Sequence, residues 1–354
     1  MTDHEQNAAY NLTDTCLSPL TLQALTAMDD KGRLKDIKLD YGEITGNSEL
    51  KKEILSLYKT GTLENLTLTN GCNEANKLVM ETLLKEGDEV LTWTPGYQSY
   101  VSYPESLGCH VTELKLYEED GWQGKKEELL RAFDHKIRLV IINRPHNPTG
   151  SVFNEAYISL LIELAKKAGA WILSDEVYRP ASLSSLSDLY EKGISTSSLS
   201  KLYSLAGLRM GWIKGREDLI QKINERRDYS LISTGPLIDT LSLVALEHKD
   251  LIYKRNEAIL EGNKAAVRKW LEHETRCSLV MPAYGTVSFL KYRIPMKSAE
   301  LSRDLQKKTG VFFVPGSCFH EEYHLRLGLT PEAGIMEKGL SLFSDYLDSL
   351  ELSQ

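Results

Sequence analysis

Short apolar runs alternate with amphipathic stretches through the middle of the chain. Residues 64–71 form one such run, and residues 72–87 follow it with a face of side chains spaced three and four apart, which predicts a helix. That face consists of Ala75, Leu78, Val79, Thr82 and Leu83. The first half of residues 137–150 is apolar at nearly every position, which predicts a strand that is buried on both faces.

Two further stretches continue this alternation. Residues 87–97 predict a strand that ends at Pro95 and Gly96, and residues 155–178 predict a helix, a glycine stop and another apolar strand. Strands that alternate with helices indicate an α/β fold with a mainly parallel central sheet flanked by helices. Ligands bind such sheets at the carboxyl ends of the strands, so the residues after each run are candidates for a functional site.

Composition narrows the function classes. The chain has 354 residues, which suggests two domains, and its 42% hydrophobic and 26% charged residues are typical of a globular protein. A formal net charge of −8 argues against a general nucleic-acid or anionic-membrane binder. No signal-peptide pattern opens the chain and no uncharged apolar run reaches about 18 residues, so we expect a cytoplasmic protein without a membrane span. The five cysteines are scattered without metal-ligand spacing, so we expect mostly buried free thiols and no metal site.

Polar or aromatic residues follow each predicted strand. After the first strand, Gly71, Cys72 and Asn73 open a helix whose free N–H groups would favour a phosphate, although a plain helix cap explains this turn as well. Tyr97 follows the next strand, either as a stacking platform or as a loop anchor. Asn147 follows the third strand and lies between two prolines, which restrict the conformation of its loop.

The next two polar positions carry opposite charges. Asp175 and Tyr178 follow the fourth strand, and a buried acid is costly without a cationic partner. Lys201 follows a serine-rich run, with Ser198 before it and Arg209 after it. Taken alone, a lysine in such a turn is usually a solvated surface residue. Taken with the other strand ends, these residues predict a pocket that suits a phosphorylated, cationic, aromatic aldehyde.

Seven segments, in this order and spacing, carry a family resemblance. They are YGEITGNSELKKEI, TNGCNEA, TPGY, NRPHNPTG, SDEVY, SLSKLYSLAGLRMGW and LRLGL. In these segments the chain resembles, over nearly its whole length, the fold-type I, class I/II aminotransferases, which use pyridoxal 5′-phosphate (PLP). The resemblance implies the PLP-transferase fold type I, with a large PLP-binding α/β domain over residues 41–249. A smaller α+β domain would consist of residues 1–40, the N-terminal arm, and residues 250–354.

The resemblance also implies roles for residues around the cofactor ring. Lys201 would form the internal Schiff base and move a proton at the substrate Cα, because its amine, desolvated and near other cations, would lose its proton readily. Asp175 would keep the ring nitrogen protonated. Asn147 and Tyr178 would hydrogen-bond the phenolic oxygen of the ring, and Tyr97 would stack on the ring face.

Further residues are implied for the phosphate, the substrate and the second subunit. The phosphate would be held by Ser198, Arg209, Cys72 and Asn73, the last two through their backbone. Arg326 and Asn147 would bind the substrate. Arg326 would clamp its α-carboxylate, and the alternative is that Arg326 is a surface arginine at a strand edge. Tyr41 matches a tyrosine that reaches the phosphate of the neighbouring subunit, which implies a homodimer with shared active sites.

Three function classes remain open. The leading one is an aminotransferase that acts on an α-amino acid and a 2-oxo acid. The second also uses PLP but catalyses a different reaction. It is a dioxygen-dependent amino-acid (arginine-type) oxidase/deaminase or a β-eliminating C–S lyase. The third is a non-catalytic binding module such as the sensor half of a transcription factor, which the lack of a DNA-binding extension disfavours. No second arginine can be placed opposite Arg326, so a dicarboxylate substrate has no support.

Overall fold

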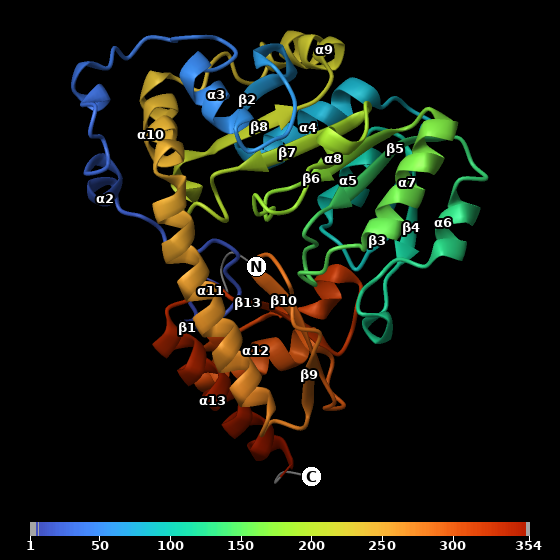
Figure 1. The fold of residues 1–354 in the computed structure, drawn as a ribbon. Coiled ribbons are helices and arrows are strands. Elements are labelled where there is room, and N and C mark those ends of the chain that lie inside the picture. Colours follow the sequence, from blue (N-terminus) through green and yellow to red (C-terminus); the bar gives the residue numbers. More distant parts are fainter. Residues whose placement is uncertain (1–4, 6, 352–354) are drawn as a thin grey trace.

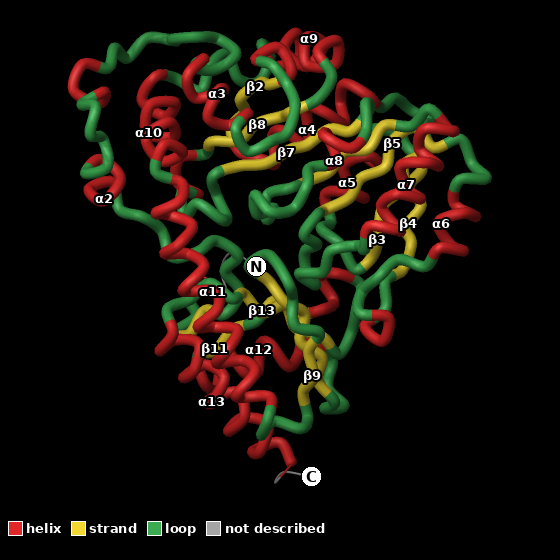
Figure 2. The backbone as a smooth tube through the Cα atoms, in the orientation of Figure 1, coloured by secondary structure: helices red, strands yellow, loops and turns green. Residues whose placement is uncertain are grey.

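A seven-stranded sheet forms the larger part of the fold in the computed structural model, which describes residues 5 and 7–351 (Figures 1 and 2). Its strand order is β2-β8-β7-β6-β5-β3-β4. The strands are β2 (Leu66–Asn70), β3 (Glu89–Thr94), β4 (His110–Lys115), β5 (Ile137–Asn143), β6 (Trp171–Asp175), β7 (Gly193–Ser198) and β8 (Met210–Lys214). Strand β8 is antiparallel to both of its neighbours, and the other pairs of this sheet are parallel. The predicted mainly parallel sheet is therefore confirmed.

Helices cover both faces of this sheet. One face packs against α4 (Gly71–Leu83), α5 (Ser99–Ser106) and α9 (Glu217–Arg227), and the other against α6 (Lys126–Ala132), α7 (Glu155–Ala168) and α8 (Leu186–Leu189). Strand β5 gives Leu139 and Ile141 to the first core and Val140 and Ile142 to the second. This strand is thus buried on both faces, as its continuous apolar run predicts.

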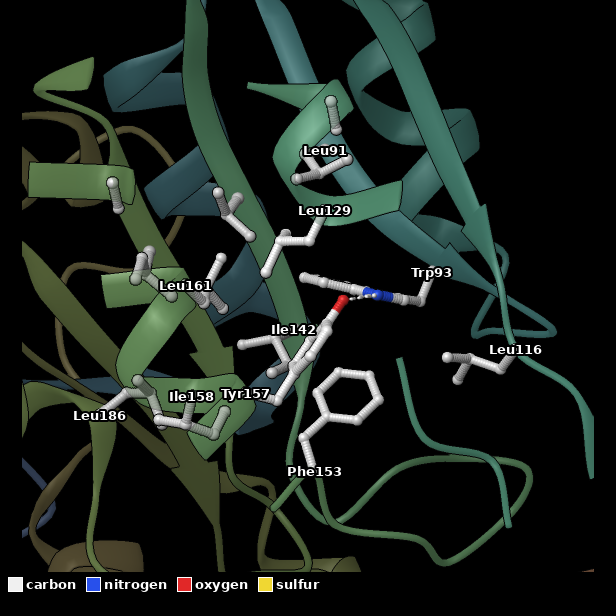
Figure 3. Close-up of a cluster of buried hydrophobic side chains, with 14 of the residues drawn as sticks. Leu91, Trp93, Leu116, Leu129, Ile142, Phe153, Tyr157, Ile158, Leu161 and Leu186 are labelled. Carbon is white, nitrogen blue, oxygen red and sulfur yellow. Dashed lines mark hydrogen bonds between the residues drawn. The ribbon is translucent and has the colours of Figure 1, made fainter. Parts of the chain in front are cut away.

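Figure 3 shows the core between α7 and the sheet. Tyr157 of α7 packs against Phe153, with ring centroids 4.8 Å apart, and lies beside Trp93 of β3. The indole Nε1 of Trp93 donates a hydrogen bond of 3.1 Å to the Tyr157 hydroxyl. The polar atoms that these rings carry into the core are therefore paired with each other.

The ends of α7 follow from its sequence. Asn154 precedes the helix, and its side chain accepts a hydrogen bond from the backbone N–H of Tyr157, which is the usual role of an N-cap asparagine. Gly169 ends the helix with a φ of +69°, a left-handed conformation that glycine adopts without strain. The predicted helix and its glycine stop are confirmed.

The smaller part of the fold contains an antiparallel sheet of order β12-β13-β10-β9. Its elements are β9 (Cys277–Leu279), β10 (Val287–Tyr292), β12 (Val314–Pro315), β13 (His324–Gly328), α12 (Ser298–Thr309) and α13 (Ala333–Glu351). The long helix α11 (Lys249–Leu271) connects this part to the larger one (Figure 1). Ile252 near its start belongs to a core of the larger part, and Val267 near its end belongs to the core of the smaller part.

The N-terminal segment touches both parts. Strand β1 (Tyr10–Asn11) pairs in parallel with β11 (Val311–Phe312) of the smaller part. The helices α2 (Leu22–Thr26) and α3 (Ser48–Leu55) pack against α10 (Pro236–Glu247) of the larger part. The domain boundaries at residues 41 and 249 remain a prediction. Among the described residues, no helix is both long and apolar enough to cross a membrane.

Candidate active site

A cavity of about 430 Å³ lies at the carboxyl edge of the large sheet, facing the smaller part of the fold. The residues that follow β6 and β7 line it, as do the start of α4 and the loop after β3. Strand β8 reverses direction, so its neighbour β2 runs parallel to β7 and ends at the same edge. This topology brings together polar residues from strands that are far apart in the sequence.

Asp175 lies at the end of β6 and is 5% exposed. One carboxylate oxygen accepts hydrogen bonds from Asn76 Nδ2 (2.7 Å) and from the Tyr100 hydroxyl (2.8 Å), and the other accepts one from the backbone N–H of Val177 (3.1 Å). Burial raises the pKa of Asp175, and the hydrogen bonds from Asn76 and Tyr100 oppose this rise. Asn76 is oriented in turn by Thr196, whose hydroxyl donates to Asn76 Oδ1 (2.6 Å).

Lys201 follows β7, and its amine lies inside the cavity. Its Nζ donates hydrogen bonds to Thr15 Oγ1 (2.6 Å) and Cys16 Sγ (3.2 Å) from the N-terminal segment. Burial lowers the pKa of Lys201, but Tyr178 and Cys16 favour the charged amine more strongly, so the pKa is raised above its ordinary value. The groups that act on this amine are thus Tyr178, Cys16 and Asp14, and not the other cations expected from the sequence.

Arg326 of β13 enters the cavity from the smaller part and is 7% exposed. One guanidinium nitrogen donates to the carbonyl of Thr13 (3.1 Å), and another donates to Asn147 Oδ1 (3.4 Å). Its Nε atom is buried without a hydrogen-bond partner among the described residues. Burial lowers the pKa of Arg326. The backbone N–H of Asn147 donates to Asn143 Oδ1 (2.7 Å), so the end of β5 fixes the loop that carries Asn147.

The other end of the cavity is a glycine-lined turn. A Cβ atom on Gly71 would lie 2.5 Å from Nη2 of Arg209, so the guanidinium closely covers this glycine, whose φ is +80°. Arg209 itself has a φ of +53°, an uncommon conformation for a residue with a side chain. Ser198, at the end of β7, and Cys72 line the same end of the cavity. Burial raises the pKa of the Cys72 thiol well above its ordinary value, so this side chain stays protonated.

The structure brings together all but one of the residues singled out from the sequence. The cavity is lined by Cys72, Asn73, Tyr97, Asn147, Asp175, Tyr178, Ser198, Lys201, Arg209 and Arg326. Tyr41 does not line this cavity and is 65% exposed. Tyr97 is 41% exposed and makes an edge contact with Tyr100, with ring centroids 5.4 Å apart.

Several lining residues escape sequence reasoning. They are Glu5, Asn11, Thr13, Asp14, Thr15, Cys16, Asn76, Tyr100 and Asn143. Asn76 has a signal that could have found it, since it is a polar residue beside the apolar face of the predicted helix. The thiols also differ from expectation, because only Cys109 and Cys277 are buried and Cys16 lies half-buried against Lys201.

The comparisons with known proteins agree with this geometry. The family model described as aminotransferase class I and II matches residues 12–340. Capreomycidine synthase of Streptomyces vinaceus is 28% identical over 312 residues, covering 86% of this chain and 80% of that protein. An aspartate aminotransferase of Sulfolobus acidocaldarius is 24% identical over 334 residues, covering 88% and 83%.

A solved structure is similar over nearly the whole length. It is described as a PLP-dependent aminotransferase from Streptococcus suis, is 36% identical, has a TM-score of 0.94, and the match covers 98% of this chain and 96% of that one. The match of the family model extends over more than nine-tenths of the chain. The chain therefore belongs to the aminotransferase class I and II family.

Proposed function

We propose that this protein is a PLP-dependent transaminase, which transfers an amino group between an α-amino acid and a 2-oxo acid. One observation carries the assignment of the site: the Lys201 amine shares one cavity with a buried carboxylate, Asp175, and a buried guanidinium, Arg326. Family membership and the 36% identity to the Streptococcus suis aminotransferase support the reaction and the cofactor.

The residues of the cavity fit PLP. Asp175 is buried, and no ion pair is found for it within residues 5 and 7–351, so a cationic ring nitrogen would supply the partner that a buried carboxylate needs. The turn at Gly71 leaves no space for a side chain beneath Arg209, which suits the close approach of a phosphate to backbone N–H groups. Ser198, Cys72 and Asn73 would complete this phosphate site.

When bound, PLP supplies an aldehyde that reacts with amines and a ring that accepts electrons from the substrate Cα. Lys201 would hold the cofactor and would move a proton at the substrate Cα, since its amine is the one lysine group among the described lining residues. Asp175 would keep the ring nitrogen protonated. Tyr178 and Asn147 would donate to the ring oxygen, and Tyr97 would cover one face of the ring.

Arg326 orients the substrate. Its unpaired Nε and its neighbouring guanidinium nitrogens can donate to a carboxylate, and a planar guanidinium matches the two oxygens of that group. The contact with Asn147 places this carboxylate site next to the ring site. A bound α-carboxylate would thus hold the substrate Cα within reach of Lys201.

We propose further that the protein is a homodimer. Exposed apolar side chains gather on two adjoining loops, residues 39–44 and 229–235, and on the start of α10, and they are Leu39, Tyr41, Ile44, Tyr229, Ile232 and Leu237. Arg227 joins the loops, because its Nη1 donates to the carbonyls of Ile44 and Ile232. An exposed apolar surface of this kind is typical of an interface, and Tyr41 would reach the phosphate site of the partner subunit from it.

The dimer proposal can be tested at this surface. The double substitution Leu39→Glu and Tyr229→Glu is expected to convert a dimer into a monomer, because it would bury two carboxylates in the interface. Analytical ultracentrifugation measures the change, and Leu189→Glu, at an exposed leucine outside the two loops, is the matched control. A wild-type protein that sediments as a monomer would contradict the proposal.

Tyr41→Ala should weaken PLP binding by about tenfold in a cofactor titration, because the variant lacks the hydroxyl proposed to reach the phosphate of the partner subunit.

The reaction type has its own test. The purified enzyme is given each amino acid with and without a 2-oxo acid acceptor, while oxygen, peroxide, ammonia and thiol are measured. A transaminase transfers the amino group only when the acceptor is present and consumes no oxygen. Oxygen uptake with an amino acid alone would replace this proposal with an oxidase, and release of thiol and ammonia from cystathionine would replace it with a C–S lyase.

A further inference from the structure

All described cationic residues that line the cavity have a role in the proposed reaction, but not all of its acidic residues do. The three cations are Lys201, Arg209 and Arg326. Of the three carboxylates, only Asp175 has a role. Two acids of the N-terminal segment, Glu5 and Asp14, are left over. Glu5 Oε1 accepts from the Thr13 hydroxyl (3.2 Å), the exposed Asp14 accepts from the backbone N–H of Cys16 (2.8 Å), and neither forms a salt bridge within the described residues.

Asp14 belongs to a segment that is fixed in place. Four successive carbonyls, from Leu12 to Thr15, accept hydrogen bonds from residues of the smaller part. The donors are the Gly328 N–H (2.8 Å), Arg326 Nη2 (3.1 Å), the Thr330 hydroxyl (2.8 Å) and the Thr286 hydroxyl (2.7 Å). The carbonyl of Asp14 also lies so close to Gly328 that a Cβ atom there would be 1.8 Å from it.

The same segment reaches the two groups that handle the substrate. Thr13 joins the acids to the carboxylate site, because its hydroxyl donates to Glu5 Oε1 (3.2 Å) and its carbonyl accepts from Arg326. Thr15 lies against the Lys201 amine. Arg326 itself is buried, lines the cavity and keeps an unpaired Nε, so it independently indicates a carboxylate-bearing ligand beside the two acids.

We infer that Glu5 and Asp14 form an acidic subsite for the side chain of the substrate, so that the preferred amino donor carries a guanidinium or ammonium group. The inference rests on the transaminase proposed above. The α-carboxylate of such a donor would lie on Arg326, and its distal cation would pair with Glu5 and Asp14. A dicarboxylate is disfavoured, because its second carboxylate would face two acids.

The test compares L-arginine with L-citrulline, which has nearly the same shape but no charge. In the PLP-loaded enzyme, followed through the absorbance of the cofactor, kcat/KM for L-arginine is expected to exceed that for L-citrulline by about tenfold, as for a charge-assisted contact. L-glutamate should react more slowly than either. The double variant Glu5→Gln and Asp14→Asn should reduce the preference for arginine to about twofold or less, since amides keep the local hydrogen bonds without the charge.

Glu191→Gln is the matched control, because Glu191 is exposed and lies outside this cavity, and the arginine preference should be unchanged. Equal kcat/KM for arginine and citrulline, or a preference for glutamate, would overturn the inference, as would an unchanged preference in the double variant. Calorimetric titration of PLP-loaded Lys201→Ala with both amino acids measures binding without turnover. Tighter binding of arginine there supports the subsite even if the reaction is not transamination, and equal binding overturns it.

Discussion

Lys201→Ala is expected to remove the covalent attachment of PLP and to reduce the transaminase activity by on the order of 10⁴-fold or more. The described part of the cavity has no second lysine, so no neighbouring amine can take over the attachment or the proton transfer at the substrate Cα. Borohydride reduction of the purified enzyme, followed by peptide mapping, identifies the labelled residue. Label on Lys201 is the expected result.

The matched control is Lys167→Ala, at an exposed lysine of α7 that pairs with Glu163 on the same helix. This variant should keep the covalently bound PLP and the activity of the wild type. If reduction labels another lysine, or if Lys201→Ala still carries the cofactor covalently, the central assignment of the site is wrong.

The centre of the main sheet could be predicted from the sequence because β5 and β6 are buried on both faces and are mostly apolar, and helices with one apolar face lie between such strands in the chain. The edge strand β4 is partly exposed and β7 is buried but polar, so neither carries this signal. The direction of β8 could not be predicted in this way. A single reversed strand has the same apolar pattern as a parallel one, and pattern alone does not encode direction.

The ring and phosphate ends of the candidate site could also be predicted, since their residues directly follow strands that meet at one edge. The substrate end of the site could not be predicted. Thr15 contacts Lys201 across 186 positions of sequence, and the hydrogen bonds that fix its segment involve backbone carbonyls, which leave no trace in residue type. The raised pKa of Lys201 could not be predicted in full for the same reason, because two of the groups that raise it, Cys16 and Asp14, come from that segment, while the third, Tyr178, follows β6.

Asp175 could be recognised for a different physical reason. A carboxylate at the end of a buried strand has lost its contact with water, so it requires several donors or a cation. The structure supplies three donors, and the protonated ring nitrogen of PLP would supply the cation. We therefore expect the activity to depend on the charge of Asp175 more than on the size of its side chain.

Asp175→Asn is expected to keep PLP attached to Lys201 and to lower kcat by on the order of 100-fold or more, about 2.7 kcal/mol in the barrier. The amide has the size of the carboxylate but no charge to keep the ring nitrogen protonated, so the ring becomes a poorer acceptor of electrons from the substrate Cα. Rates of the half-reaction with an amino acid, measured by stopped-flow absorbance, test this expectation.

Two controls separate the charge of Asp175 from its structural role. Thr196→Val removes the hydroxyl that orients Asn76 but leaves the carboxylate in place, so it should cost less than tenfold. A cofactor analogue with a methylated ring nitrogen, which is cationic without any proton, should restore part of the rate of Asp175→Asn and give the wild type no advantage. If Asp175→Asn stays within tenfold of the wild type, or if the analogue restores nothing, then Asp175 supports the cavity through its hydrogen bonds to Asn76 and Tyr100, and its charge has no part in the chemistry.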